Sequence, residues 1–353
     1  MPARMPQLVS IQYLRALAAL MVVIYHARLQ TDRLGLPLAG TDWLASGVDI
    51  FFVISGLIMW VTTTVRPVEP ATFLWRRVVR IVPLYWILTS LVVAVSLLAP
   101  SLLRTARFDP GHTLASYLFL PWPHPAMGLP LPVLIPGWTL NYEMAFYLVF
   151  GLALLMPERA RFWAMGAALA LPVALARILP GPGFALEFYG ATLVLEFWMG
   201  LALGRLVVAG RLPGAGASAA LVVLGFALLP LGWAWSEPLS RGLALGPPAA
   251  LVVLGALGLE AAGRVPARRA PLLVGDASYA LYLFHVTLLA ALTEAWRRLP
   301  MPRGPAGTAL FLAVAVVACI AAGLVLYWLV ELPLRRAMRG RAARVAAAQA
   351  RAV

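Results

Sequence analysis

Two ionisable side chains, Arg15 and His26, stand eleven residues apart in the first apolar segment of this chain. On a helix, eleven residues make three turns plus about 20°, so both side chains project from one face, about 16 Å apart. Ionisable groups inside a membrane span are costly and usually belong to a pathway or a reaction centre. Because histidine titrates near neutral pH, His26 suits a general base acting on a hydroxyl group. The alternative is that Arg15 extends its charged end towards the inner surface while His26 lies at the interface.

Two carboxylates occur in other apolar segments, at a depth that we expect to match that of His26. Asp49 belongs to GVDIFFVISGLIMW, and Glu143 lies in PGWTLNYEMAFYLVFGL, about 7 Å below Trp138 along a helix axis. A buried carboxylate orients a neighbouring imidazole and stabilises its charged form, so we expect Glu143 or Asp49 to contact His26. The alternatives are an interfacial cap at Asp49 and a structural ion pair at Glu143.

A pair of arginines, Arg77 and Arg80, lies in the segment FLWRRVVRIVPLYW that precedes the third apolar span. If this segment is helical, the two side chains share a face, and two forked guanidinium groups on one face suit phosphate. Simple anchoring at the inner surface is the alternative. Ser55 and Gly56 are small residues deeper in the second span, where they allow a ligand or another helix to approach closely.

A second histidine, His285, lies near the middle of the span that contains VGDASYALYLFHVTLL, accompanied by Tyr282. A histidine at this depth indicates either a substrate contact or a hydrogen bond between helices. The sequence leaves both interpretations open.

The composition places these residues in a membrane. Of the 353 residues, 62% are hydrophobic and only 12% are charged, which lies outside the range of soluble proteins. We therefore predict an all-α, polytopic membrane protein with about ten transmembrane helices in one bundle. The expected spans are 8–28, 46–64, 81–100, 138–156, 162–179, 190–208, 217–235, 243–262, 274–294 and 306–330.

The net charge of +14 comes entirely from arginine, since the chain contains no lysine. These arginines lie in short loops between apolar segments, which argues against a nucleic-acid partner. With both termini in the cytoplasm, 18 arginines fall on the inner side and nine on the outer side. We therefore predict a transmembrane domain over 1–334, a basic cytoplasmic tail over 335–353, and a long outer loop over 101–137 with a short helix near TLASYLFLPW.

Six motifs in order resemble the acyltransferase 3 family of integral membrane acyltransferases, over nearly the whole chain. They are YLRALAALMVVIYHA, GVDIFFVISGLIMW, WRRVVRIVPLYW, WTLNYEMAFYLVFG, GDASYALYLFH and YWLVELPLRR. The first and fourth are most similar to those of bacterial exopolysaccharide O-acetyltransferases. One departure is that many members have two adjacent glutamates in the fourth motif, whereas here Tyr142 precedes a single Glu143.

The resemblance implies acyl transfer from a cytoplasmic donor, usually acetyl-CoA, to a sugar hydroxyl of a glycan at the bacterial inner membrane. The sequence contains no metal-ligand cluster, so we expect no metal. The resemblance assigns Arg15 and His26 to the family's essential pair, and Arg77 and Arg80 to donor binding. The expected catalytic residues are thus His26, Glu143 and Arg15. Arg77, Arg80, Ser55 and Gly56 are expected around the donor, with Asp49, Trp138, His285 and Tyr282 around the acceptor or supporting the site.

The same residues allow two mechanisms and a second class of function. His26 suits direct transfer as a base, and equally a relay through an acetyl-histidine. The main alternative to an enzyme is a transporter or flippase of a lipid-linked sugar, which would use the same buried polar groups as a translocation path. A flippase, however, has no need of the Arg77 and Arg80 pair. The motifs leave the oligomeric state undetermined.

Overall fold

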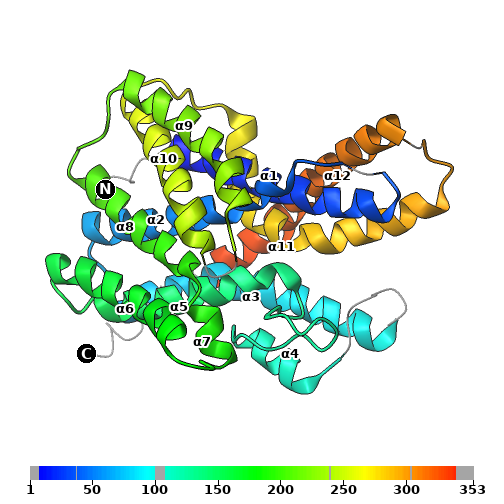
Figure 1. Cartoon of the computed structure of the whole chain (residues 1–353), viewed down its shortest axis with the longest axis horizontal. Helices are drawn as coiled ribbons and strands as arrows, with labels where there is room; N and C mark the ends of the chain where they lie inside the picture. Colours follow the sequence, from blue (N-terminus) through cyan, green and yellow to red (C-terminus); the bar gives the residue numbers. More distant parts are fainter. Residues whose placement is uncertain (1–7, 37, 100–107, 238–239, 303, 339–353) are drawn as a thin grey trace.

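The computed structural model describes residues 8–36, 38–99, 108–237, 240–302 and 304–338. Within these ranges the chain forms helices and loops without strands, which confirms the predicted all-α class. In chain order the helices are α1 (Val9–Arg33), η1 (Asp42–Ser46), α2 (Gly47–Val65), α3 (Pro70–Leu98), α4 (Pro110–Tyr117), η3 (Ile135–Gly137), α5 (Trp138–Ala153), α6 (Glu158–Ile178), α7 (Phe184–Tyr189), η4 (Thr192–Val194), α8 (Leu195–Val208), α9 (Ala215–Ala234), α10 (Arg241–Ala261), α11 (Arg269–Arg298), α12 (Gly304–Leu326) and η5 (Tyr327–Glu331) (Figure 1).

Eight helices in the described ranges are long and apolar enough to cross a membrane. The two other predicted spans, 138–156 and 190–208, correspond to α5 and α8, which have only 16 and 14 residues. At 1.5 Å per residue they measure about 24 and 21 Å, less than the roughly 30 Å of a hydrocarbon core. The span 138–156 ends in turn residues after Ala153, and the span 190–208 begins with a turn and the 3-10 helix η4, so part of each predicted span is not α-helical.

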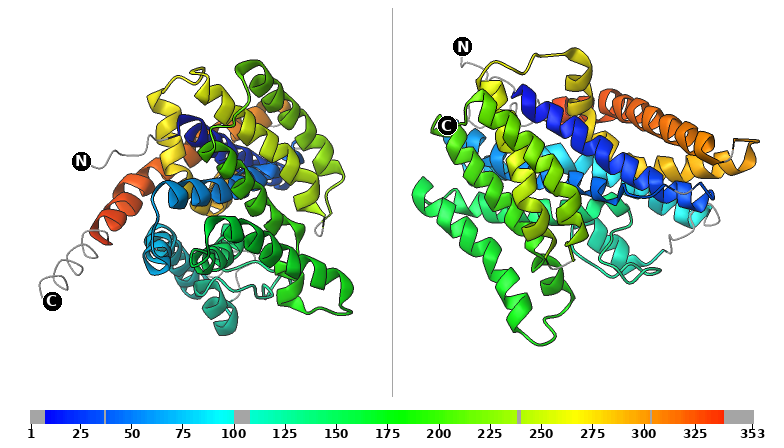
Figure 2. Two further views of the ribbon diagram at one scale, coloured as in Figure 1. Left: turned by 90° about the vertical axis from the view of Figure 1, so that its left-hand side faces the viewer. Right: turned by 45° about the horizontal axis from the view of Figure 1, so that its top comes forward.

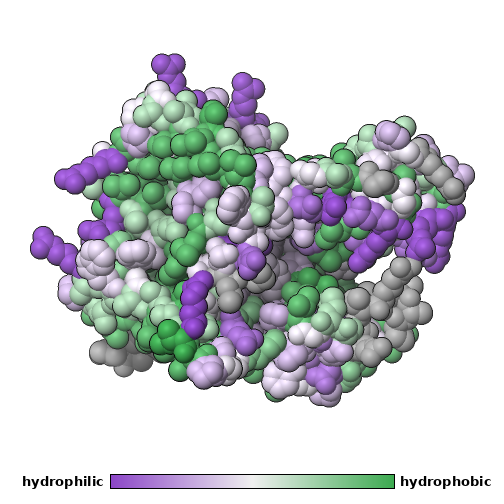
Figure 3. Space-filling view, viewed as in Figure 1, coloured by the Kyte–Doolittle hydropathy of each residue, from purple (hydrophilic) through white to green (hydrophobic). Residues whose placement is uncertain are grey.

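The helices differ strongly in how much of their surface the bundle covers. In the span that contains α2, 78% of the apolar window is buried, whereas the windows of α6, α9 and α12 are about one fifth buried. α2 packs against α8, while α1 packs against α11 and α9 against α10 (Figure 2). On the face shown in Figure 3, hydrophobic residues cover broad areas over α9 and α10. The peripheral helices thus present the apolar surface that a lipid environment requires.

The third span begins earlier than the sequence suggested. The predicted span started at residue 81, whereas α3 starts at Pro70, a residue type favoured at the first helical position. Arg77 and Arg80 therefore lie within a helix, and their spacing of three places both on the same side of α3.

The outer loop and the tail are described only in part. α4 lies close to where a short helix was predicted in the 101–137 loop. Of the predicted tail 335–353, only 335–338 belong to the described residues, and the remainder lies outside them.

Candidate active site

The predicted common face of Arg15 and His26 is directed towards α11. Nη2 of Arg15 donates to Oγ of Ser278 at 2.9 Å, and His26 lies against His285. The two helices run parallel, because a third contact further along joins Gln30 to Thr293. They also approach closely, since a Cβ on Gly275 of α11 would meet a backbone oxygen of α1. The spacing deduced from the sequence therefore describes one side of a tight helix pair.

Hydrogen bonds fix the tautomers of the two histidines. Nδ1 of His285 lies 2.6 Å from the carbonyl oxygen of Tyr282, and because a carbonyl only accepts, this nitrogen carries the proton. Nε2 of neutral His285 is then an acceptor. Nδ1 of His26 lies 2.9 Å from the Val22 carbonyl and 3.2 Å from Nε2 of His285, so it donates. The remaining nitrogen of His26, Nε2, thereby keeps its lone pair, as a general base or nucleophile requires.

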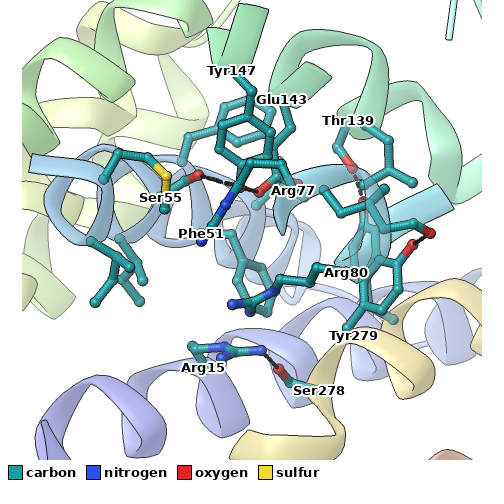
Figure 4. A pocket seen from close by; sticks show the side chains of 18 of the residues that line it. Arg15, Phe51, Ser55, Arg77, Arg80, Thr139, Glu143, Tyr147, Ser278 and Tyr279 are labelled. Atoms are coloured by element: carbon teal, nitrogen blue, oxygen red, sulfur yellow. Dashed lines mark hydrogen bonds between the residues drawn. The ribbon is translucent and has the colours of Figure 1, made fainter. Parts of the chain in front are cut away.

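A cavity of about 200 Å³ opens between α1, α2, α3, α5 and α11. Three guanidinium groups border it, those of Arg15, Arg77 and Arg80 (Figure 4). Nε of Arg77 is buried without a hydrogen-bond partner among the described residues, and its guanidinium lies 5.8 Å from the centre of the Tyr147 ring. A concentration of positive charge with an unused buried donor is suited to an anionic ligand.

Glu143 lines this cavity and does not contact His26, contrary to the expected pairing. Its carboxylate accepts a short hydrogen bond from the Tyr147 hydroxyl, one helical turn along α5. It also accepts from Oγ of Ser55 at 3.2 Å. Glu143 therefore balances the positive charge of the arginine-lined cavity, and the imidazole of His26 is oriented by the Val22 carbonyl together with His285.

The histidine pair lies just beyond the cavity. Neither His26 nor His285 lines it, whereas Tyr282 does, and the Tyr282 ring centre is 5.7 Å from that of His285. The Tyr282 hydroxyl lies 3.0 Å from Oγ1 of Thr139 at the start of α5. Tyr282, which the sequence predicted near the acceptor or in support of the site, thus lies between the arginine-lined cavity and the histidine pair.

Asp49 has a different partner from the one we expected. Its fully buried carboxylate accepts two hydrogen bonds from Arg241 at the start of α10, at 3.1 and 2.7 Å. Glu196 of α8 is also fully buried and lies beside this ion pair. In the sequence Arg241 is only one of the nine outer arginines, because nothing local links residues almost two hundred positions apart.

Gly56 and Trp138 also lie outside the arginine-lined cavity. A Cβ on Gly56 would lie 2.0 Å from the carbonyl oxygen of Phe197 in α8, so this glycine serves helix packing. Ser55, its neighbour, does line the cavity. Trp138 borders a separate cavity, described below.

A second cavity, of about 360 Å³, adjoins the first. The two share Gln12, Arg15 and Arg80. The second is completed by Asp276, Tyr327 and the helical residues 332–338 that follow η5, here called the C-terminal helix, which include Arg335 and Arg336. We call this second cavity the vestibule. The first turns of α1 and the C-terminal helix thus meet at this cavity.

The comparison with protein families is decisive for the class of protein. The model of a family described as an acyltransferase domain, Acyl_transf_3, matches residues 8–328. The chain belongs to this acyltransferase family.

Individual relatives cover most of this acyltransferase chain. It is 40% identical over 310 residues to the exopolysaccharide production protein ExoZ of Rhizobium meliloti (strain 1021), spanning 86% of this chain and 92% of ExoZ. It is 29% identical over 326 residues to the acyltransferase MdmB of Streptomyces mycarofaciens, spanning 82% of this chain and 81% of MdmB. No solved structure shows a significant match.

Proposed function

We propose that this protein is an O-acetyltransferase of the bacterial inner membrane. It moves an acetyl group from cytoplasmic acetyl-CoA to a sugar hydroxyl of an exopolysaccharide or another cell-envelope glycan. Family membership supports acyl transfer, and the similarity to ExoZ, which is named for exopolysaccharide production, supports the glycan acceptor. The observation that carries the proposal is the bare Nε2 of His26 next to an arginine-lined cavity.

Acetyl-CoA fits the vestibule and the arginine-lined cavity, which adjoin one another. The vestibule carries Arg80, Arg335 and Arg336, which suit the phosphate groups of CoA. Its shared wall at Arg15 leads to the arginine-lined cavity, whose mixed polar and apolar lining suits the extended pantetheine arm. Because the ring of Tyr282 separates this cavity from His285, it must turn aside for the thioester to reach the histidine pair.

The proposed step balances with the residues at hand. Nε2 of His26 takes the proton of the acceptor hydroxyl as its oxygen attacks the acetyl carbonyl carbon. The new C–O ester bond forms, the C–S bond of the thioester breaks, and the CoA thiolate leaves. The proton on His26 then passes to that thiolate, which regenerates the neutral imidazole and releases CoA as its thiol.

The test is a comparison of donor binding and acetyl transfer in purified full-length protein in nanodiscs, with labelled acetyl-CoA. We expect His26→Gln to bind acetyl-CoA as tightly as the wild type while losing at least about 10²-fold in turnover, the usual contribution of a general base. We expect Arg77→Ala/Arg80→Ala to bind the donor at least tenfold more weakly. The matched control is Arg76→Ala, an exposed neighbour on the same helix, which should change neither quantity.

Two outcomes would contradict the proposal. Wild-type protein that neither binds nor consumes acetyl-CoA would exclude this donor and make translocation of a lipid-linked sugar the next activity to measure. Full turnover by His26→Gln would remove the histidine from the chemistry. Label that stays on the wild-type protein after denaturation, and not on His26→Gln, would identify the relay through an acetyl-histidine.

A further inference from the structure

A third cavity, of about 760 Å³, lies among segments that connect the helices on the side predicted to be outer. Its walls come from the loop before η3, the start of α5, α7, the end of α9 and the start of α10. The vestibule lies instead at the first turns of α1 and the end of the C-terminal helix. This third cavity has the size of a site for a small molecule or for a few units of a polymer. We call it the outer cavity.

Aromatic rings dominate the outer cavity. Trp138 and Tyr142 come from α5, Phe188 from α7 and Trp233 from α9. Tyr142 and Phe188 are themselves stacked, with ring centres 4.1 Å apart, which holds both rings in place. Rigid aromatic faces pack against the C–H faces of a pyranose ring, and they cost little conformational entropy when a ligand binds.

The charged side chains of the outer cavity differ in depth, with two glutamates at the rim and one arginine at the base. Glu187 and Glu237 are exposed, whereas the Arg241 side chain is only 19% exposed and is held by Asp49 through two hydrogen bonds. Carboxylates accept hydrogen bonds from sugar hydroxyls. Because Asp49 already neutralises Arg241, the two glutamates give the cavity a negative balance, which disfavours an anionic ligand.

The outer cavity adjoins the histidine pair through two aromatic side chains. The ring of Trp233 lies 6.3 Å from that of Tyr25, and the Tyr25 ring lies 4.9 Å from the His26 ring. On the opposite wall, Trp138 is followed directly by Thr139, which lines the arginine-lined cavity and contacts Tyr282. The donor side and the outer cavity therefore meet at the first turn of α5, close to His26.

We propose that the outer cavity binds the acceptor, with an uncharged pyranose unit of a saccharide packed on Trp138 and Trp233. This proposal rests on the acetyltransferase function proposed above and deepens it by assigning the acceptor site. Glu187 and Glu237 accept hydrogen bonds from the hydroxyl groups of neighbouring units. The bound unit presents one hydroxyl past Tyr25 to Nε2 of His26.

The experiment measures acetyl transfer to saccharide chains from the cell's own envelope glycan, after alkaline removal of their acetyl groups. We expect Trp233→Ala to raise the KM for the acceptor about tenfold, the value of one aromatic contact, with an unchanged KM for acetyl-CoA. Trp233→Phe should recover most of the loss. Trp235→Ala, an 82% exposed tryptophan two residues away that does not line the outer cavity, is the matched control.

A rim variant covers the case in which Trp233→Ala fails to fold. Glu187→Gln alters an exposed side chain, so we expect normal thermal unfolding and a raised acceptor KM. Unchanged acceptor KM values in Trp233→Ala and Glu187→Gln, with an active wild type, would overturn the acceptor site and leave the proposed function standing. A wild type without any acetyl transfer would instead defeat the proposed function. If an anionic glycan fraction were acetylated in preference to a neutral one, the proposal that the bound unit is uncharged would be wrong.

Discussion

At the scale of single residues, the candidate base of this acyltransferase is held by a second histidine together with a backbone carbonyl of its own helix. We expected Glu143 or Asp49 in this role, but each is engaged elsewhere, with Tyr147 and with Arg241. His285 can replace a carboxylate because the Tyr282 carbonyl fixes its own tautomer and makes its Nε2 an acceptor. A neutral orienting group also avoids the cost of placing another charge in the membrane interior.

This arrangement predicts how substitutions at His285 behave. We expect His285→Ala to lower the rate of acetyl transfer on the order of 10²-fold, because His26 Nδ1 keeps only the Val22 carbonyl as an acceptor and the ring is no longer held from α11. His285→Gln should recover much of that rate, since its amide oxygen can occupy the position of the histidine Nε2. Single-turnover rates and acetyl-CoA binding would be measured together. Equal rates for wild type and His285→Ala, or no recovery by His285→Gln, would exclude a positioning role.

At the scale of elements, α2 holds the site because it is packed on several sides. One side presents Ser55 to the arginine-lined cavity, and another contacts α8 through Gly56. Gly200 of α8 faces α2 in the same way, since a Cβ there would lie 2.1 Å from the Val53 carbonyl oxygen. These paired glycines let the helix backbones touch, as small residues do between membrane helices.

The close contact between α2 and α8 predicts that a single added methyl group at Gly56 destabilises the protein. We expect Gly56→Ala to lower the free energy of unfolding by about 1–3 kcal/mol, the usual cost of overpacking. Gly216→Ala in α9 has nothing within 4 Å of the new Cβ, so it should be neutral or stabilise by up to about 1 kcal/mol through helix propensity. Thermal unfolding in detergent checks both. Equal melting temperatures for Gly56→Ala and wild type would show that α2 and α8 are not in backbone contact.

At the scale of the whole molecule, the cavities are distributed along the bundle from one end to the other. The vestibule is bordered by the first turns of α1, and the outer cavity by the loops around α7 and between α9 and α10. The histidine pair lies between the arginine-lined cavity and the outer cavity. Such an arrangement suits a donor and an acceptor that approach from opposite sides of a membrane.

One reagent tests both the orientation of the protein in the membrane and whether α5 crosses the membrane. The single cysteine, Cys319, would be changed to alanine, and Ala126→Cys, Arg159→Cys or Ala267→Cys would be introduced at exposed positions. We expect an impermeant maleimide to label intact cells only at position 126, and the other two after permeabilisation, as the arginine distribution predicts. Labelling at 267 from outside would invert the orientation. Labelling at 159 from outside would mean that α5 does not cross, and eight spans would hold.

The sequence by itself determined the features that depend on neighbours along one helix. Apolar content defined the all-α membrane class, and helical periodicity placed Arg15 and His26 on one face and Arg77 and Arg80 on another. Six motifs also indicated the family. Side chains three, four or eleven residues apart have a fixed relation on a helix, whatever surrounds it.

Only the tertiary structure decided which helices face one another, and therefore which residues are in contact. The pairing of His26 with His285, that of Asp49 with Arg241, and the burial of Gly56 against Phe197 all join segments distant in sequence. Periodicity gives the direction of a side chain around its own axis, whereas the register between two helices is set by close packing of all their side chains. The arginine-lined cavity, the vestibule and the outer cavity are among the spaces that this packing leaves, and no local pattern specifies them.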